Sequence, residues 1–527
     1  MYAYQRKTAG ASASDTQSVT PSDELRIAVT FNRPDKSDGP TKFSAPLSLS
    51  SAMEFKPDPI TVDRAIHQLS QLGFRPTRRG ELSVSVRGTR ALFESTFGTK
   101  LSEIQLDPMH NYAFRSLYYP AQGAPWSMPP ELAQVLDDAY IQWPHIYMGR
   151  KAKTRAGKPA PKTLATGRIK RASTMAGAVA GLPSVKPPEV DFFHLTIPDG
   201  VTGLLNVDQV HKAGITGKGV RVCMIDTGFA HSHPYFVSKG YKTSVDLAPH
   251  ASNDATDPNG HGTGESANML GVAPDITFIG IKLGNDEDSN NGASLLEGFQ
   301  QALLHNPQII SCSIGFDLRK PDFTQMSELP NNMAALEAEI QAAIAKGIIV
   351  VFSAGNGHFS FPGMMPNVIS AGGVFVDRDG SKQASDFASA FHSLIYPGRS
   401  VPDFCGLVGM LPNAAYIGLP VPPASQIDRD ESTDGDGTAP DDGWGIFSGT
   451  SAAAPQLAGV CALLVQKNPG LSPSDAKAIL RRTAIGVPTG SANPTSGIGN
   501  VGEPASTGDT GATGAGLVDA FAAFRQL

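Results

Sequence analysis

The segment GKGVRVCMIDTG (residues 217–228) decides the fold class. Its apolar run VRVCMI does not alternate with polar residues, and it ends at Asp226, which the turn residues Thr227 and Gly228 follow. Strands buried on both faces have this pattern, and they are typical of parallel sheets covered by helices on both sides. The segment therefore predicts an α/β domain with an aspartate at the carboxyl end of a buried strand.

From about residue 190 onward, expected strands alternate with expected helices. Further strands are expected at 276–283, 307–315, 348–356 and 366–374, and helices at 294–305 and 333–347. This alternation predicts a parallel sheet with helices on both faces. Active sites in such sheets lie at the carboxyl ends of the strands, where the loops meet.

A smaller domain is expected upstream, over residues 24–146. Its expected strands are 25–31, 81–88 and 101–106, and its expected helices are 61–74 and 89–98. We expect Thr61 and Asp63 to supply the start of the first helix. The mixture of strands and helices predicts a small α+β domain of the ferredoxin-like kind.

Two further segments have no periodic pattern. Residues 1–23 are rich in Ser, Thr and Ala and are expected to form a disordered tail. Residues 147–190 are expected to form a linker to the main domain, residues 191–527, because they carry many Lys and Arg residues, little acid, and much Gly, Pro and Ala. A protease-sensitive activation segment, a solvated tether and a nucleic-acid arm are the alternatives for this linker.

The composition excludes several classes of protein. The 527 residues carry a net charge of −6, which gives no overall electrostatic case for nucleic-acid binding. No apolar stretch reaches the ~20 residues that a membrane-spanning helix needs. The four cysteines lack metal-site spacing and are expected to be buried thiols. We expect a cytoplasmic protein, since no apolar leader follows the first basic residues, although export by another route stays open.

A candidate nucleophile lies in FSGTSAAAPQLAGVCALLV (residues 447–465). Small residues surround Ser451, which allows a substrate backbone to approach, and an apolar helical run follows. Pro455 is expected in the first turn of that helix, where a missing N–H does little harm. A serine hydroxyl is a weak nucleophile and needs a neighbouring base.

The candidate base is His261, which is flanked by Gly260 and Gly262. A histidine base needs a carboxylate that holds its tautomer and stabilises the imidazolium. Asp226, at the end of its strand, is expected to be that carboxylate. Alone, each residue is more often structural than catalytic, so the case depends on their combination.

These residues stand in motifs that resemble those of the subtilases. The matches are IDTGF (225–229), NGHGT (259–263), SAGNG (353–357) and SGTSAAAP (448–455), in the order Asp, His, Ser along the chain. The resemblance covers about residues 195–527. It implies a serine endopeptidase that works through an acyl-enzyme and needs no cofactor for catalysis. It also implies that Asn356 donates a hydrogen bond to the oxyanion.

The same resemblance implies a place for the substrate. The strand SCSIG (residues 311–315) resembles the substrate-binding strand of the family. Ser313, Ile314 and Gly315 would then pair with the backbone of a peptide or protein substrate, as an added β-strand does. No membrane partner is implied.

The N-terminal domain resembles the activation domain of sedolisins over residues 84–105. That resemblance implies an autoprocessed zymogen in which the N-terminal domain inhibits its own enzyme. Sedolisins have a glutamate and an aspartate where this chain has His261 and Asn356, so we expect chemistry at neutral pH. A binding module with a dead protease fold and a nucleic-acid binder are the competing classes, and the presence of all four site residues favours an active enzyme.

Two acidic features have alternative interpretations. Glu265 lies four residues after His261 on one helix face, and it is either a helper in catalysis or a glutamate favoured by the helix dipole. The loop 431–445 carries Asp434 and Asp436, which are weak candidates for a structural calcium site. The alternative for this loop is a solvated acidic segment.

Overall fold

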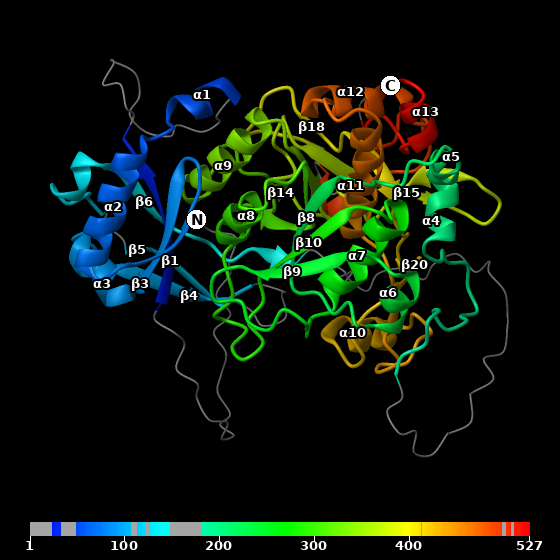
Figure 1. Ribbon diagram of the computed structural model, residues 1–527, viewed down its shortest axis with the longest axis horizontal. Helices are drawn as coiled ribbons and strands as arrows, with labels where there is room; N and C mark the ends of the chain where they lie inside the picture. The colour runs from blue at the N-terminus through cyan, green and yellow to red at the C-terminus, as the bar shows by residue number, and fades with distance from the viewer. Residues whose placement is uncertain are drawn as a thin grey trace.

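The computed structural model describes residues 24–32, 49–106, 113–121, 126–147, 182–412, 414–497, 502–506 and 511–527. The expected tail and residues 148–181 of the expected linker lie outside this part of the chain. Within it, a small N-terminal domain lies beside a larger α/β domain (Figure 1).

The centre of the larger domain is an eight-stranded sheet. Its strands are β8 (Arg221–Asp226), β9 (Thr243–Leu247), β10 (Thr277–Lys282), β11 (Ile309–Cys312), β13 (Ile349–Ser353), β15 (Ile369–Val376), β16 (Lys382–Ala384) and β19 (Phe404–Leu407). The order is β16-β15-β13-β11-β8-β10-β9, with β19 also paired to β15. Only β16 is antiparallel to its neighbour among these strands. The predicted parallel sheet is therefore confirmed.

Helices cover both faces of this sheet (Figure 1). The helices α7 (His261–Val272) and α11 (Thr450–Lys467) lie on one face, and α8 (Leu295–Leu303) and α9 (Ala334–Ala345) lie on the other. Val222 and Met224 of β8 belong to the hydrophobic core on the α11 side, whereas Cys223 and Ile225 belong to the core on the α8 side. Both faces of β8 are thus buried, which explains its uninterrupted apolar sequence. All four cysteines are buried and free.

Shorter elements complete the larger domain. They are α4 (Asp199–Leu204), α5 (Val207–Lys212), α6 (Pro234–Lys239), α10 (Gln426–Asp434), α12 (Pro473–Thr483), α13 (Ala520–Phe524), β12 (Ile314–Asp317), β14 (Ser360–Phe361), β17 (Phe391–His392), β18 (Ser400–Val401), β20 (Ile417–Pro420) and β21 (Trp444–Phe447). No helix in the described ranges is long and apolar enough to cross a membrane.

The placement of Pro455 in the first turn of its helix was wrong. Helix α11 begins at Thr450 after the N-cap Gly449, so Pro455 lies in the second turn. A proline there removes the N–H that would otherwise bond to the carbonyl four residues earlier, which belongs to Ser451. That carbonyl instead accepts a hydrogen bond from Ser313 Oγ at 2.9 Å.

The small domain has a four-stranded antiparallel sheet. Its strands are β1 (Glu24–Phe31), β2 (Arg75–Arg79), β3 (Ser83–Thr89) and β6 (Leu136–Ile141), in the order β2-β3-β1-β6. Helix α2 (Pro59–Leu72) follows β1, and α3 (Arg90–Thr96) follows β3. The short helix α1 (Leu49–Glu54), the hairpin β4 (Leu101–Gln105) and β5 (Ser116–Pro120), and β7 (Ile146–Tyr147) are additions.

The predicted start of the first helix was also wrong. Asp58 caps α2, and its Oδ1 accepts a hydrogen bond from Thr61 N at 2.9 Å. Pro59 stands at the first helical position, where its fixed φ suits a helix start. An aspartate cap followed by proline is a stronger start signal than Thr61 or Asp63, which lie inside the helix.

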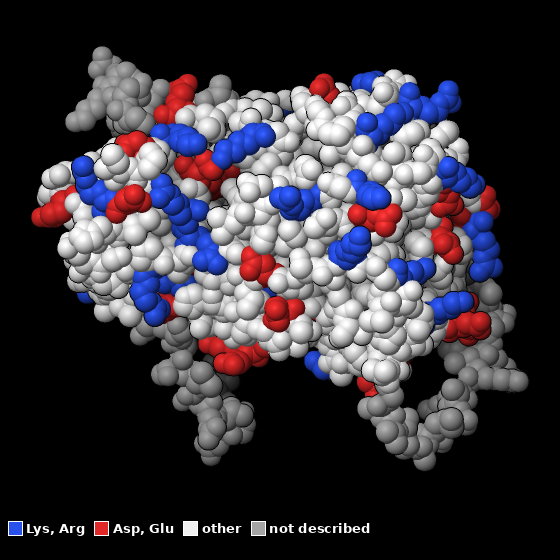
Figure 2. All heavy atoms as spheres, in the orientation of Figure 1, with Lys and Arg blue, Asp and Glu red and all other residues white. Residues whose placement is uncertain are grey.

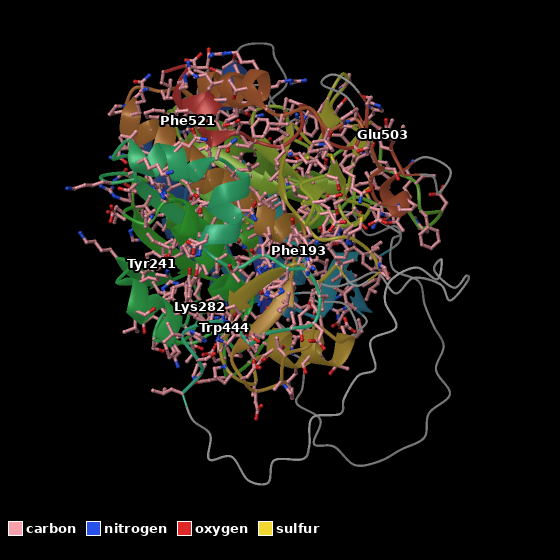
Figure 3. All side chains as sticks on the ribbon, turned by 90° about the vertical axis from the view of Figure 1, so that its right-hand side faces the viewer. Phe193, Tyr241, Lys282, Trp444, Glu503 and Phe521 are labelled. Carbon is pink, nitrogen blue, oxygen red and sulfur yellow. The ribbon has the colours of Figure 1, made fainter. Side chains whose placement is uncertain are left out.

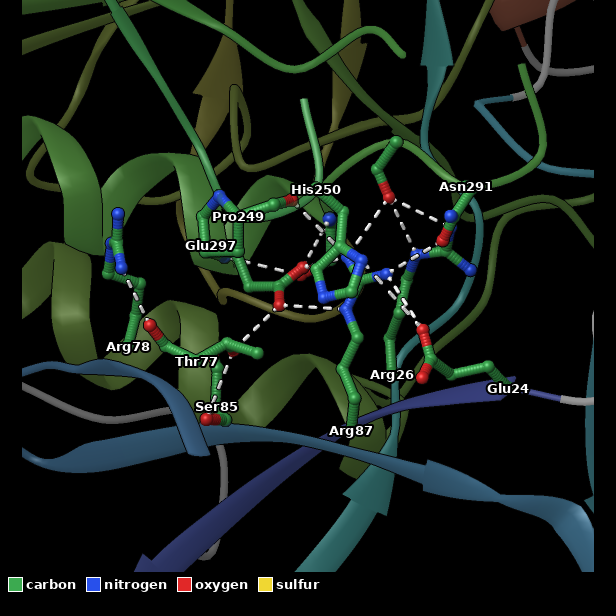
Figure 4. A network of polar contacts seen from close by, with 12 residues as sticks. Glu24, Arg26, Thr77, Arg78, Ser85, Arg87, Pro249, His250, Asn291 and Glu297 are labelled. Carbon is green, nitrogen blue, oxygen red and sulfur yellow. Dashed lines mark hydrogen bonds and ion pairs between the residues drawn. The ribbon is translucent and has the colours of Figure 1, made fainter. Parts of the chain in front are cut away.

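Buried polar contacts join the small domain to α8, where Figure 4 shows them, and also to α9. The Arg87 guanidinium of β3 lies 3.0 Å from Glu297 Oε2 of α8, and neither side chain is more than 1% exposed. Glu339 of α9 accepts hydrogen bonds from Leu82 N and from the Ser83 N–H and hydroxyl. The polar face of β3 is therefore buried against the larger domain, while its apolar face lies in the small domain's own core.

The end of the expected linker packs on the larger domain. Trp444 of β21 (Figure 3) donates from Nε1 to the carbonyl of Ser184 at 3.0 Å. At the other end of the linker, Tyr147 belongs to β7. The described parts of residues 147–190 are thus held at both ends by contacts to the larger domain.

Candidate active site

Asp226 and His261 meet where β8 ends and α7 begins. His261 Nδ1 lies 2.7 Å from Asp226 Oδ1, and both side chains are buried. Thr227 N donates to the same carboxylate oxygen at 2.7 Å. Gly262 is required here because α7 approaches the turn after β8 closely. A Cβ on Gly262 would lie 2.3 Å from the carbonyl oxygen of Gly228.

The electrostatic environment favours the protonated form of His261. Burial alone lowers the pKa of this imidazole, but the charge and hydrogen bond of Asp226 outweigh burial, and the pKa is raised to about 9. A proton held on Nδ1 by Asp226 leaves Nε2 as the atom that can accept a proton. His261 Nε2 has no hydrogen-bond partner among the described residues.

Ser451 lies in the first turn of α11 and faces the same cavity as His261. Its Oγ also has no hydrogen-bond partner among the described residues. Its backbone is held by the bond from Ser313 Oγ to its carbonyl oxygen at 2.9 Å. The serine hydroxyl is thus available to a base, while its backbone is fixed to the strand that the sequence assigns to substrate.

Asn356 follows β13 and lies beside the N-terminus of α11. Its Oδ1 accepts hydrogen bonds from Thr450 N at 2.9 Å and from Thr450 Oγ1 at 3.0 Å. Those bonds orient the amide, and a Cβ added to Gly449 would lie 2.6 Å from Asn356 Nδ2. This role of Thr450 was not predicted from the sequence, although its place between Gly449 and Ser451 in the SGTS motif was the available signal.

One cavity brings these groups together. It is lined by His261, Glu265, Asn356, Phe387, Ala414, Glu431, Phe447, Ser448, Gly449 and Ser451. A hydroxyl, a base oriented by a carboxylate, and an amide donor around one cavity can together perform nucleophilic attack on a carbonyl. Glu431 was not identified from the sequence, because nothing in its acidic helix indicates contact with a site built by distant segments.

Glu265 is buried beside this site, in the second turn of α7. Its Oε2 accepts from Asn268 Nδ2 at 2.9 Å, whereas Oε1 has no hydrogen-bond partner among the described residues. Burial raises the pKa of this carboxyl to about 7. Glu265 is therefore not a solvated glutamate at a helix end, and its role as a helper stays a prediction.

Of the three predicted substrate-binding residues, Ser313 bonds to Ser451, and a strand that follows the N-terminal domain is paired with the other two. Strand β7 runs antiparallel to β12, with Ile146 opposite Gly315 and Tyr147 opposite Ile314. The preceding residue, Ser313, bonds to Ser451 as described above. The chain's own N-terminal domain thus supplies an extended segment to the strand that the sequence assigns to substrate.

Asp434 and Asp436, the calcium candidates of the acidic segment 431–445, have different surroundings. Asp436 is buried, and it accepts hydrogen bonds from Thr438 N at 2.8 Å and from Ile446 N at 2.8 Å. Asp434, in contrast, is exposed at the end of α10. Within the described ranges, no group of three or more His, Cys, Asp or Glu side chains is arranged to hold a metal ion. The calcium site at Asp434 and Asp436 stays a prediction.

Comparisons with known proteins agree with this geometry. The Subtilase family model matches residues 217–516. The chain is 28% identical to Subtilisin DY of Bacillus licheniformis over 307 residues, which cover 55% of this chain and 92% of that protein. It is 29% identical to Serine protease AprX of Bacillus subtilis (strain 168) over 316 residues, which cover 54% and 65%. It is 26% identical to M-protease of Shouchella clausii over 349 residues, which cover 64% and 72%.

Proposed function

Because this chain belongs to the subtilase family of serine endopeptidases, we propose that Asp226, His261 and Ser451 are its catalytic triad. The enzyme hydrolyses peptide bonds in peptide or protein substrates. The single observation that carries the assignment is the bond from His261 Nδ1 to Asp226 Oδ1 at 2.7 Å, with His261 and Ser451 lining one cavity.

The roles follow from the chemistry of each group. His261 Nε2 takes the proton of the Ser451 hydroxyl as the oxygen attacks the carbonyl, and it then gives that proton to the leaving amine. Asp226 stabilises the imidazolium that forms between these two steps. Asn356 donates from Nδ2 to the negatively charged oxygen of the tetrahedral intermediate. In subtilisins the loss of one such donor costs about 10²–10³-fold in turnover.

We propose further that the N-terminal domain is an intramolecular inhibitor and that the enzyme is made as an autoprocessed zymogen. The pairing of β7 with β12 supports this proposal, since an extended segment on the substrate strand excludes other peptides. The sequence of the basic linker supports it as well, because segments rich in small and polar residues are preferred sites of proteolysis.

The nucleophile is tested by Ser451→Ala. The hydrolysis of casein should fall by about 10⁶-fold, which is the size of effect seen when a subtilisin loses its nucleophile. Ser474→Ala, at an exposed serine of α12, is the matched control and should keep full activity. A fluorophosphonate probe should label wild type and the control but not Ser451→Ala. Activity of Ser451→Ala within tenfold of wild type, with an unchanged melting curve, would remove the assignment.

A further inference from the structure

Strand β7 gives the direction in which a peptide runs through the cleft. It is antiparallel to β12, with Ile146 opposite Gly315 and Tyr147 opposite Ile314, so its chain advances toward Ser313. The Ser313 hydroxyl in turn donates to the carbonyl of Ser451. A peptide that continues in this direction reaches the nucleophile and then passes beyond it, away from β12. The residues beyond the nucleophile belong to the leaving group.

None of the described residues that line the cavity at Ser451 belongs to β12, the strand on which residues before the scissile bond would pair, and we therefore assign the cavity to the leaving-group side. Two carboxylates stand in its wall, Glu265 of α7 and Glu431 of α10, and none of its described lining residues is Lys or Arg. The wall also contains Phe387 and Phe447. Apolar rings can cover the alkyl stem of a long basic side chain while carboxylates bind its head group.

Glu265 is a lining carboxylate with one oxygen that lacks a hydrogen-bond partner among the described residues. Its side chain is fully buried, and Oε1 has no hydrogen-bond partner among the described residues. An ionised carboxylate in a buried place is costly unless it is paired, and burial accordingly raises the pKa of Glu265 to about 7. A cation that enters the cavity would supply the missing partner.

We propose that the leaving-group side of this cleft selects a lysine or arginine within the first two residues after the scissile bond, through Glu265 and Glu431. The inference rests on the proposed function, because it assigns the substrate class of the same site. The segment after Tyr147 in this chain carries the positive charges that such a site would bind. Arg150, Lys151, Lys153 and Arg155 follow closely after Tyr147, and no Asp or Glu occurs before Glu189.

The test uses five peptides that share the sequence of residues 143–148 and differ in a four-residue tail. One tail is all alanine, and the others carry a single Arg or a single Glu at the first or second tail position. The kcat/KM of the mature enzyme is measured for each peptide, and mass spectrometry identifies the bond that is cut. We expect an Arg tail to be cut about tenfold faster than the alanine tail, and both Glu tails more slowly than alanine.

Three variants locate the source of this selectivity. Glu265→Gln and Glu431→Gln should each bring the Arg-to-Ala ratio toward one. Asp434→Asn removes an equal charge from the exposed end of α10, outside the cavity, and should keep the wild-type ratio.

Equal rates for all tails, faster cleavage of Glu tails, or an unchanged ratio in both glutamine variants would overturn the inference. None of these outcomes affects the proposed function, because that function requires only that the alanine tail is cut by wild type and not by Ser451→Ala. If no tail is cut in a Ser451-dependent manner, the proposed function fails and the inference fails with it.

Discussion

Two carboxylates lie near the imidazole of His261 and act on it differently. Asp226 bonds directly to Nδ1 and fixes the tautomer, whereas Glu265 acts through its charge alone. Both stabilise the imidazolium and so raise the pKa of His261, against the lowering effect of burial. The base is therefore stronger than a free histidine, and it is neutral over a smaller range of pH.

This arrangement predicts the pH dependence of the reaction. The neutral form of His261 is the base, so kcat/KM should rise as the pH increases through its pKa. A free histidine would give a midpoint of about 6.5, and the raised pKa moves the midpoint above that value, toward about 9. Glu265→Gln removes one negative charge and should move the midpoint to lower pH. The measurement is the pH profile of kcat/KM on an uncharged peptide.

An acidic optimum near pH 3–4 that disappears in Glu265→Gln would contradict this account. It would show that a carboxyl group, not the imidazole, is the base. Glu287→Gln, at an exposed glutamate of the larger domain, is a control that should leave the profile unchanged.

Most residues of the site could be predicted from short sequence motifs, whereas the others depend on tertiary contacts. Asp226, His261 and Ser451 could be found from the sequence because each has a characteristic short context. In the structure His261 and Ser451 line one cavity, and Asp226 bonds to His261 behind it. The bond between Ser313 and Ser451 could not be predicted. Pro455 frees the Ser451 carbonyl, but the donor, Ser313, comes from a segment that is distant in the sequence. Glu431 was missed for the same reason.

At the scale of elements, buried strands and long helices were predicted well, and helix ends less well. The apolar runs of β8 and β13 indicate strands whatever surrounds them. The start of α2 depends instead on one capping hydrogen bond, from Thr61 N to Asp58, which competes with other local signals. The polar face of β3 is buried because α8 and α9 cover it. The sequence pattern of β3 itself does not indicate that these helices pack on it.

The contact between β3 and α8 yields a prediction. Arg87→Leu leaves Glu297 buried without its cation, which should cost about 3 kcal/mol, or roughly a hundredfold in affinity. The measurement is the inhibition constant of residues 24–147 added to mature enzyme, with circular dichroism to show that the variant domain is folded. Arg79→Leu changes a half-exposed arginine of β2, whose ion pair is with Asp63 of the same small domain, and serves as the control. Equal inhibition constants for the two variants would show that the Arg87 pair does not hold the domains together.

At the scale of the whole molecule, the N-terminal domain has two points of attachment. Its sheet docks on α8 through the network of Figure 4 and on α9 through Glu339, and β7 pairs with β12 at the cleft. Acidic and basic side chains are interspersed on the face of the described residues in Figure 2, which gives no support there to a nucleic-acid surface. A domain held in this way either inhibits until it is cut away, or remains attached and regulates access.

The intact masses of wild type and Ser451→Ala, purified side by side, test the account most directly. If Ser451 is the nucleophile and the chain processes itself, wild type should appear as two fragments, with the cut after Tyr147 and before the described chain resumes at residue 182. Ser451→Ala should remain a single chain of 55.3 kDa. Identical cleavage of both proteins, or a wild type that stays full length while fully active, would contradict the account.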